Sequence, residues 1–262
     1  MNDCDFSIII PAYNNVDLFK RALDSAFRQK NVSIEIIVVD DSINDDIENY
    51  IKNINKSYIR YYHNNPTKGA IPNWNYGLSL AKGKYIEVLH HDEALSNDNI
   101  LSEVKHSFEM KQISSVVVNY EVLIDGHVKK EIFIKKLLRP YFCEHPTILF
   151  LANLLGPCAC LFIKNDNVEF FDEKLRWFVD VDWYYRILRG KKTCTLNPHL
   201  FVSSIHGHTG QITASINIQS EAKKDAQVIS KKYHSIYINL LLFINKSFEN
   251  TLIKRIIKKT LK

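Results

Sequence analysis

Apolar residues in the first ninety positions follow two alternating spacings, which indicates strands alternating with helices. Continuous β-branched runs predict four strands, at 6–10, 34–39, 59–63 and 85–89. Apolar positions repeating every three or four residues predict the intervening helices, at 16–28, 47–54 and 72–81. Asn15 can cap the first of these helices. Such alternation predicts an α/β fold, with a mostly parallel, Rossmann-like sheet and helices on both faces.

The second half of the chain has a less regular pattern. It predicts strands at 115–122 and 128–133, an apolar block at 148–163, a helix at 181–188 and a helical stretch from about 220 to the C-terminus. Neither an internal repeat nor a low-complexity linker interrupts it. We therefore expect one main domain, residues 1–215, followed by a helical C-terminal extension, residues 216–262.

Composition and cysteine usage indicate a globular protein in a reducing compartment. Hydrophobic residues make up 46% and charged residues 24% of the chain, as in ordinary soluble domains. Five scattered cysteines argue against a disulfide framework. The N-terminus has no basic region before its apolar run, and Gly156-Pro157 interrupts the longest apolar block. We expect a cytoplasmic protein.

The net charge of +5 comes from the end of the chain. Leu252–Lys262 carries five basic residues and no acid, which leaves the rest of the chain balanced and argues against a nucleic-acid partner. On a helix, the apolar and basic residues of this tail would lie on opposite faces. Such a helix either packs on the domain with a solvated basic side or lies on the anionic inner face of the cytoplasmic membrane.

Glycine-rich phosphate-binding motifs are absent from the sequence. Pro11-Ala12-Tyr13-Asn14-Asn15 follows the first strand where a dinucleotide site would have G-x-G-x-x-G, and there is no P-loop motif. A bound nucleotide would therefore need its phosphates neutralised in another way. A divalent metal held by carboxylates is the usual substitute.

Polar clusters follow two of the predicted strands, where an open α/β sheet binds its ligands. Asp40-Asp41 could simply cap a turn, or one carboxylate could accept the N3–H of a uracil. The residues 90–93, His-His-Asp-Glu, could be a solvated turn or a metal site of oxygen and nitrogen ligands.

Two further acids, Asp180 and Asp182, lie among aromatic residues at the start of a predicted helix. Acids here either stabilise the helix N-terminus or include a base with a tuned pKa.

Together these segments resemble glycosyltransferase family 2, an inverting family with the GT-A fold. In family order they are Ser7–Asn14 (SIIIPAYN), Ile36–Ser42 (IIVVDDS), Asn73–Leu78 (NWNYGL), Ala81–Ile86 (AKGKYI), His90–Glu93 (HHDE), Val179–Trp183 (VDVDW) and His208–Thr213 (HTGQIT). His90–Glu93 falls where the family has D-x-D-D, and Val179-Asp180 where it has E-D. The last segment resembles an H-x-x-Q-x-T element of bacterial surface-polysaccharide enzymes.

The resemblance implies roles for individual residues. Asp180 would be the general base. The donor site would hold Pro11, Tyr13, Asp41, Trp74, Asn75 and His91. Asp92 would bind Mn²⁺ or Mg²⁺, assisted by His90 or His91 and by His208, which we prefer to His206. His90 and Glu93 replace two acids of D-x-D-D, which implies a weaker metal site centred on Asp92.

The implied reaction is transfer of a hexose, with inversion, from a nucleotide-sugar, for which UDP is the expected nucleotide. The acceptor would be a hydroxyl of a polyprenyl-diphosphate-linked saccharide at the inner membrane surface, as in O-antigen or capsule synthesis. Two alternatives stay open. One is a catalytically silent nucleotide-binding protein of the same fold, suggested by the altered D-x-D. The other is a sugar-phosphate nucleotidyltransferase. Enzymes of that kind have a glycine-rich first loop, and the segment Pro11–Asn15 does not resemble it.

Overall fold

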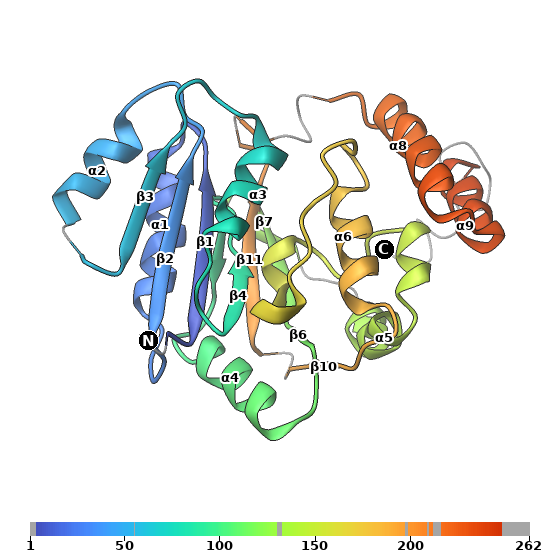
Figure 1. Ribbon diagram of the computed structural model, residues 1–262, viewed down its shortest axis with the longest axis horizontal. Coiled ribbons are helices and arrows are strands. Elements are labelled where there is room, and N and C mark those ends of the chain that lie inside the picture. Colours follow the sequence, from blue (N-terminus) through green and yellow to red (C-terminus); the bar gives the residue numbers. More distant parts are fainter. Residues whose placement is uncertain are drawn as a thin grey trace.

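The computed structural model describes residues 4–54, 56–129, 133–196, 199–208, 210–211 and 216–247 (Figure 1). Its central sheet has seven strands, in the order β10-β6-β9-β4-β1-β2-β3. Their bounds are β1 Phe6–Ala12, β2 Ile34–Asp40, β3 Ile59–His63, β4 Tyr85–Val88, β6 Ser115–Val117, β9 Leu161–Lys164 and β10 Thr193–Thr195. Only β9 runs antiparallel to its neighbours, β4 and β6. The α/β prediction with a mostly parallel sheet is therefore confirmed.

A second, four-stranded sheet extends the fold. Its order is β5-β11-β7-β8, with bounds β5 Glu93–Leu95, β7 Asn119–Ile124, β8 His127–Lys129 and β11 Phe201–His206. The predicted strand at 115–122 is in fact two strands, because the chain leaves the central sheet at Val118 and enters the second sheet. Val118 is fully buried, so the apolar run continues through this change of sheet and hides it from the pattern.

Helices cover both faces of the central sheet. The described helices are α1 Val16–Phe27, α2 Asp46–Ile54, α3 Ala70–Ser79, α4 Ile100–Met110, α5 Phe133–Glu144, α6 Val179–Leu188, α8 Ile218–Tyr233 and α9 Ile236–Ser247. Alternate strand residues divide the core into two clusters, because successive side chains point to opposite faces. One cluster packs α1, α2 and α4 against Ile8 and Ile10, and the other packs α3, α5, α6, α8 and α9 against the face that holds Ile9.

Local sequence explains the helices that position the site. The Asn15 side chain accepts a hydrogen bond from the Leu18 N–H at 3.0 Å, which confirms the predicted cap of α1. At Gly77 in α3, a Cβ atom would lie 2.4 Å from the Ile9 side chain, so only glycine lets this helix approach the sheet so closely.

One prediction for the second half of the chain was wrong. The predicted strand at 128–133 is shorter, ending at Lys129, and helix α5 begins at Phe133. The helix forms despite its internal Pro140 because Phe142 and Cys143 are buried, and because the buried Arg139 guanidinium donates to the Leu155 carbonyl at 2.7 Å. The predicted helical stretch from about 220 forms two helices, α8 and α9, since His234 adopts a left-handed conformation (φ 47°) that ends α8.

The C-terminal helices share the core of the main domain. Ala226 and Ile229 of α8 and Ile238, Leu241 and Leu242 of α9 join the cluster that contains α6 (Figure 1). The basic tail, Leu252–Lys262, lies outside the described residues. No helix in the described part of the chain has both the length and the apolar character needed to cross a membrane.

Candidate active site

The carboxyl ends of β4, β1 and β2 bring together several residues that the sequence predicted. These strands are neighbours, and Ala12 pairs with Asp40. The Asp41 N–H donates to the Ala12 carbonyl at 3.0 Å, and the His91 N–H donates to the Pro11 carbonyl at 3.3 Å. Tyr13 follows in an exposed turn, with 40% of its surface accessible. Pro11, Asp41 and His91 therefore meet at one edge of the sheet.

Asp41 organises the loop that follows β3. Its Oδ1 accepts hydrogen bonds from the Asn64 side chain at 3.1 Å and the Lys68 N–H at 2.7 Å, while its Oδ2 accepts one from the Gly69 N–H at 2.8 Å. A carboxylate has about four acceptor positions, so Oδ2 keeps one beyond these three hydrogen bonds. Its neighbour Asp40 is fully buried and accepts from the Tyr61 hydroxyl at 2.7 Å.

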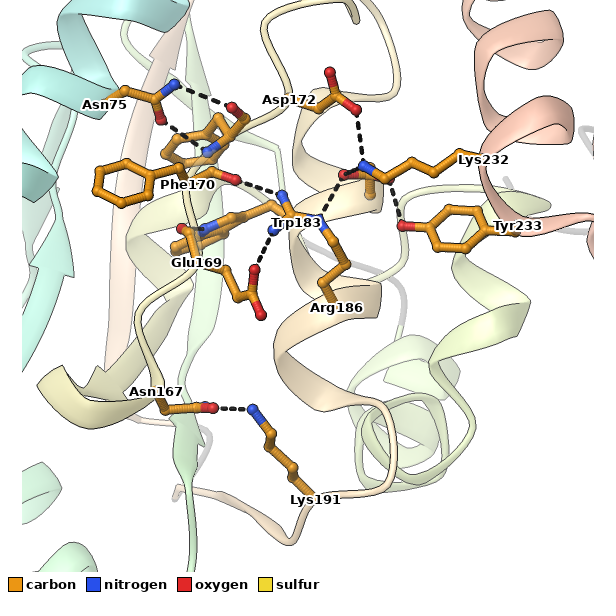
Figure 2. A network of polar contacts seen from close by, with 12 residues as sticks. Asn75, Asn167, Glu169, Phe170, Asp172, Trp183, Arg186, Lys191, Lys232 and Tyr233 are labelled. Atoms are coloured by element: carbon orange, nitrogen blue, oxygen red, sulfur yellow. Dashed lines mark hydrogen bonds and ion pairs between the residues drawn. The ribbon is translucent and has the colours of Figure 1, made fainter.

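Helix α3 carries three consecutive polar or aromatic residues to this edge. Buried Asn73 donates to the Val39 carbonyl at 2.8 Å, which fastens α3 to the end of β2. The Asn75 amide accepts from the Phe171 N–H at 2.8 Å and donates to the Phe171 carbonyl at 3.0 Å (Figure 2). It also donates to the Glu173 carboxylate at 3.0 Å. Its predicted role in donor binding stays a prediction, because these contacts already give it a role in holding the segment before α6.

His90 lies between Trp74 and Glu93. Its ring is 4.5 Å from the indole of Trp74, and its Nδ1 is 3.4 Å from the Glu93 carboxylate. Burial disfavours the charged imidazolium, but the Glu93 carboxylate, together with the charges of Asp92 and Asp180, outweighs burial and raises the pKa of His90 to about 9. Its other ring nitrogen, Nε2, is buried and forms no hydrogen bond within the described structure.

Asp92 and His208 form the closest carboxylate–imidazole pair at this edge, with Nε2 of His208 3.2 Å from Oδ2 of Asp92. Burial opposes ionisation of Asp92, but the hydrogen bond to His208 and the neighbouring imidazoles lower its pKa. The Asp92 carbonyl accepts from the Arg21 guanidinium at 3.2 Å and from the Ile205 N–H at 2.9 Å. Helix α1 and strand β11 thus fix the loop that carries this carboxylate.

Asp180 lies in the first turn of α6 and is partly exposed. Its Oδ1 accepts from the Cys158 thiol at 3.1 Å. Burial raises the pKa of the Asp180 carboxyl, and the Cys158 hydrogen bond and the His90 imidazolium partly offset that rise. Ring contacts link the start of α6 to the end of β4. The Phe171 ring stacks on Trp183 of α6 at 4.6 Å and contacts Trp74 at 5.3 Å, and Trp74 in turn lies 4.5 Å from His90.

Asp182, two residues further on, is fully buried and engaged in a structural cluster. It accepts hydrogen bonds from Arg186 at 2.9 Å, from Lys232 at 3.0 Å and from the Tyr233 hydroxyl at 2.6 Å (Figure 2). The two acids at the start of α6 thus have different surroundings: Asp180 keeps accessible surface, and Asp182 has none.

The site's donor set suits a divalent cation. Carboxylate oxygen and imidazole nitrogen are ligands of Mn²⁺, and Asp92 and His208 already place one of each 3.2 Å apart. The Nε2 of His90 forms no hydrogen bond within the described structure and would become a further ligand atom when a metal displaces the proton that it carries in the imidazolium. Among the described residues, the group of three whose ligand atoms all lie within 4.8 Å is elsewhere, at Asp45, Glu48 and His63. There Glu48 is also paired with Lys52 at 2.7 Å.

Sequence patterns missed several residues that support the site. Arg21, Cys158 and Asn64 contact Asp92, Asp180 and Asp41 from 71, 22 and 23 residues away along the chain. No local spacing indicates such contacts. The pairing of His90 with Glu93, by contrast, is visible as a short acid–imidazole spacing.

Solved structures with the same fold bind nucleotide-sugars. The structure of TarS residues 1–349 from S. aureus in complex with UDP-GlcNAc superposes with a TM-score of 0.71 over 98% of this chain and 76% of that chain, at 16% identity. The mannosyltransferase PcManGT from Pyrobaculum calidifontis, in complex with GDP-Man and Mn²⁺, gives a TM-score of 0.63 over 94% and 70% of the two chains, at 14% identity. At these identities the likeness shows the fold.

Sequence comparison reaches closer relatives. The chain is 37% identical over 213 residues to the Escherichia coli UDP-Glc:alpha-D-GlcNAc-diphosphoundecaprenol beta-1,3-glucosyltransferase WfaP, covering 80% of each protein. It spans 64%, 31% and 27% of the lengths of the first three curated relatives that it matches. Residues 7–163, which include the edge formed by β1, β2 and β4, match the family described as Glycosyl transferase family 2. With this match over more than half of its length, the chain belongs to glycosyltransferase family 2.

Proposed function

We propose that this chain is an inverting, metal-dependent glycosyltransferase that moves a hexose from a UDP-sugar to a saccharide hydroxyl on a polyprenyl diphosphate. The observation that carries the proposal is the position of Asp180. It is a partly exposed carboxylate with a raised pKa at the start of α6, and the ring contacts of Trp183, Phe171 and Trp74 connect this helix to His90 at the end of β4. A base on a helix beside a diphosphate-binding edge suits a single displacement.

Asp180 acts as the general base. An acceptor hydroxyl has a pKa far above neutrality and needs a carboxylate within hydrogen-bond reach during attack. Its oxygen bonds to the anomeric carbon as the bond from that carbon to the nucleoside diphosphate breaks, and the hydroxyl proton moves to Asp180. Attack from the face opposite the leaving group inverts the anomeric configuration. The raised pKa of Asp180 makes it a stronger base than a solvated aspartate.

The edge of the sheet binds the leaving group. Asp92 and His208, with His90 beside them, are the residues that would hold a metal ion. When bound there, Mn²⁺ or Mg²⁺ supplies a Lewis acid that stabilises the leaving diphosphate. Asp41 holds the nucleobase through its free acceptor position, next to Pro11 and Tyr13.

The acceptor assignment is supported by the relative WfaP, a glucosyltransferase that acts on a diphosphoundecaprenol-linked sugar. Such acceptors lie in a membrane, and the C-terminal extension suits a membrane surface. Residues 216–262 carry ten Lys and Arg but only three Asp and Glu. Helix α9 also exposes four large apolar side chains, Ile236, Tyr237, Leu240 and Phe243, with 51–88% of their surface accessible. We place the protein at the inner face of the cytoplasmic membrane as a peripheral protein.

The decisive experiment incubates purified protein with UDP-, GDP- and dTDP-hexoses and short-chain lipid-diphosphate saccharides, and detects products by mass spectrometry. We expect transfer from a UDP-hexose that EDTA stops and Mn²⁺ or Mg²⁺ restores. The anomeric coupling constant of the product, measured by NMR, should show inversion. Binding of UDP without turnover on any acceptor would instead support a catalytically silent binding protein, and retention of configuration would reject the single displacement.

A further inference from the structure

Helix α8 holds the turn that leads into α6 through one buried carboxylate. Asp225, which is 1% exposed, accepts hydrogen bonds from three consecutive backbone N–H groups. Its Oδ2 lies 2.9 Å from the nitrogen of Arg176, 2.7 Å from that of Trp177 and 2.8 Å from that of Phe178. Phe178 precedes α6 and has no side-chain cap of its own. Asp225, 47 residues further along the chain, thus caps the N-terminus of α6 in place of a neighbouring side chain.

The end of α8 holds the same helix a second time. Lys232 donates to both carboxylate oxygens of Asp182 at 3.0 Å, and Tyr233 donates to one of them at 2.6 Å (Figure 2). Lys232 also reaches Asp172 at 2.8 Å. Charge-assisted hydrogen bonds of this kind are about twice as strong as neutral ones.

The two attachments enclose Asp180. Asp225 fixes the backbone two residues before it, and Lys232 and Tyr233 fix the side chain two residues after it. The Asp180 side chain accepts a hydrogen bond only from Cys158 among the contacts described above. The position of its carboxylate therefore depends on how α8 holds the first turn of α6. Displacement of a reacting group by about 1 Å can lower a rate about 10²-fold.

We infer that Asp225 is a positioning residue for the general base, and that α8 positions the catalytic carboxylate of α6. The inference rests on the proposed function, in which Asp180 takes the acceptor proton. In the proposed mechanism, Asp225 contacts neither the nucleotide-sugar donor nor the acceptor saccharide. Its carboxylate sets the place and direction of the Asp180 carboxylate relative to the sugar that the sheet edge binds.

The test compares Asp225→Asn with Glu221→Gln in the full-length protein. Glu221 lies one turn earlier on α8, and its carboxylate pairs with Lys224 at 2.6 Å. Both changes remove one charge at constant size. We would measure kcat and KM for the donor, corrected for the folded fraction, and hydrogen exchange of the Arg176, Trp177 and Phe178 amides.

We expect Asp225→Asn to lower kcat at least tenfold with KM for the donor within twofold, since the donor binds at the sheet edge. The three amides should exchange at least tenfold faster, and Glu221→Gln should match the wild type in both respects. A lower melting temperature with wild-type kcat per folded molecule would mean that Asp225 only stabilises the fold, and the inference would be overturned.

A second variant covers failure of Asp225→Asn to fold. Tyr233→Phe removes one hydroxyl from Asp182 and should lower kcat about threefold at constant KM; unchanged kcat would overturn the inference. If the wild-type chain transfers no sugar, the proposed function fails by itself. Amide exchange then still decides whether Asp225 holds this turn.

Discussion

Replacing Asp180 and Asp182 separately by asparagine distinguishes the base from its neighbour. In Asp180→Asn the amide oxygen can still accept from the Cys158 thiol, so the only large change is loss of the basic carboxylate. We expect kcat to fall by about 10²-fold or more, the usual contribution of a general base, which corresponds to about 2.7 kcal/mol of activation free energy. The melting temperature should not fall, because burial already disfavours the charge of Asp180.

Asp182→Asn should have the opposite balance of effects. The buried carboxylate accepts hydrogen bonds from Lys232, Arg186 and Tyr233. In the asparagine variant, an NH2 group replaces one of its oxygens, so two hydrogen-bond donors face each other and neither has an acceptor. Breaking a buried ion pair usually costs about 3–5 kcal/mol. Arg186 keeps Glu169 at 2.7 Å and Lys232 keeps Asp172 at 2.8 Å, so we expect a smaller loss, about 2 kcal/mol. For a chain of this size that lowers the melting temperature by about 4–8 °C.

The assay pairs thermal unfolding with initial-rate kinetics at saturating donor. Asp182→Asn should lose only about tenfold in kcat, through poorer positioning of α6. A loss of 10²-fold or more in kcat for Asp182→Asn at an unchanged melting temperature, with Asp180→Asn still active, would refute the assignment of Asp180 as the base. The base would then be Asp182, and its burial would have to be relieved when the acceptor binds.

Three further predictions concern the metal site, a buried carboxyl and the tail. Asp92→Ala should abolish metal-stimulated transfer and Mn²⁺ binding measured by calorimetry, with His90→Ala milder; near-normal Mn²⁺ stimulation in Asp92→Ala would reject Asp92 as ligand. Fully buried Glu87 forms no hydrogen bond within the described structure, and burial, with the nearby Glu93 charge, raises its pKa. The wild type should therefore lose stability as the pH rises from the ordinary glutamate pKa through the raised one. Between pH 5 and pH 8, the free energy of unfolding of Glu87→Gln, measured in urea, should rise by about 1 kcal/mol relative to that of the wild type. A stability difference independent of pH would contradict this. Deleting Leu252–Lys262 should release the protein from anionic vesicles in flotation, and wild-type binding should weaken with salt, while transfer to a water-soluble acceptor persists; loss of that transfer would mean that the tail is part of the folded core.

The first half of the fold could be predicted because its periodicity is local. Each β-branched run there is followed by a polar turn and an amphipathic helix, so both burial patterns are visible in a short window. The strand at 115–122 could not be divided from sequence, since Val118 stays buried while the chain passes from one sheet to the other. Helix α5 was hidden by Pro140, whose cost tertiary contacts offset.

The site was predictable in part for the same reason. Residues that follow strands, such as Asp41 and Asp92, were placed by strand order alone, because parallel strands end at one edge. The supports of the site could not be found in this way. Asp225 and Cys158 reach α6 from distant segments, and no pattern within either segment distinguishes them from ordinary buried residues.

The chain passes from the central sheet to the second sheet within the candidate metal loop. Strand β4 ends at Val88 and β5 begins at Glu93 in the other sheet, so the residues from Leu89 to Asp92 are tethered at both ends. So short a connection between two rigid layers retains little conformational entropy for a ligand to remove. In the proposed mechanism, the dipoles and charges that would meet the diphosphate are thus preorganised, and little reorganisation energy is needed when charge develops on the leaving group. Donor affinity at this edge should consequently carry a small entropic penalty from the loop.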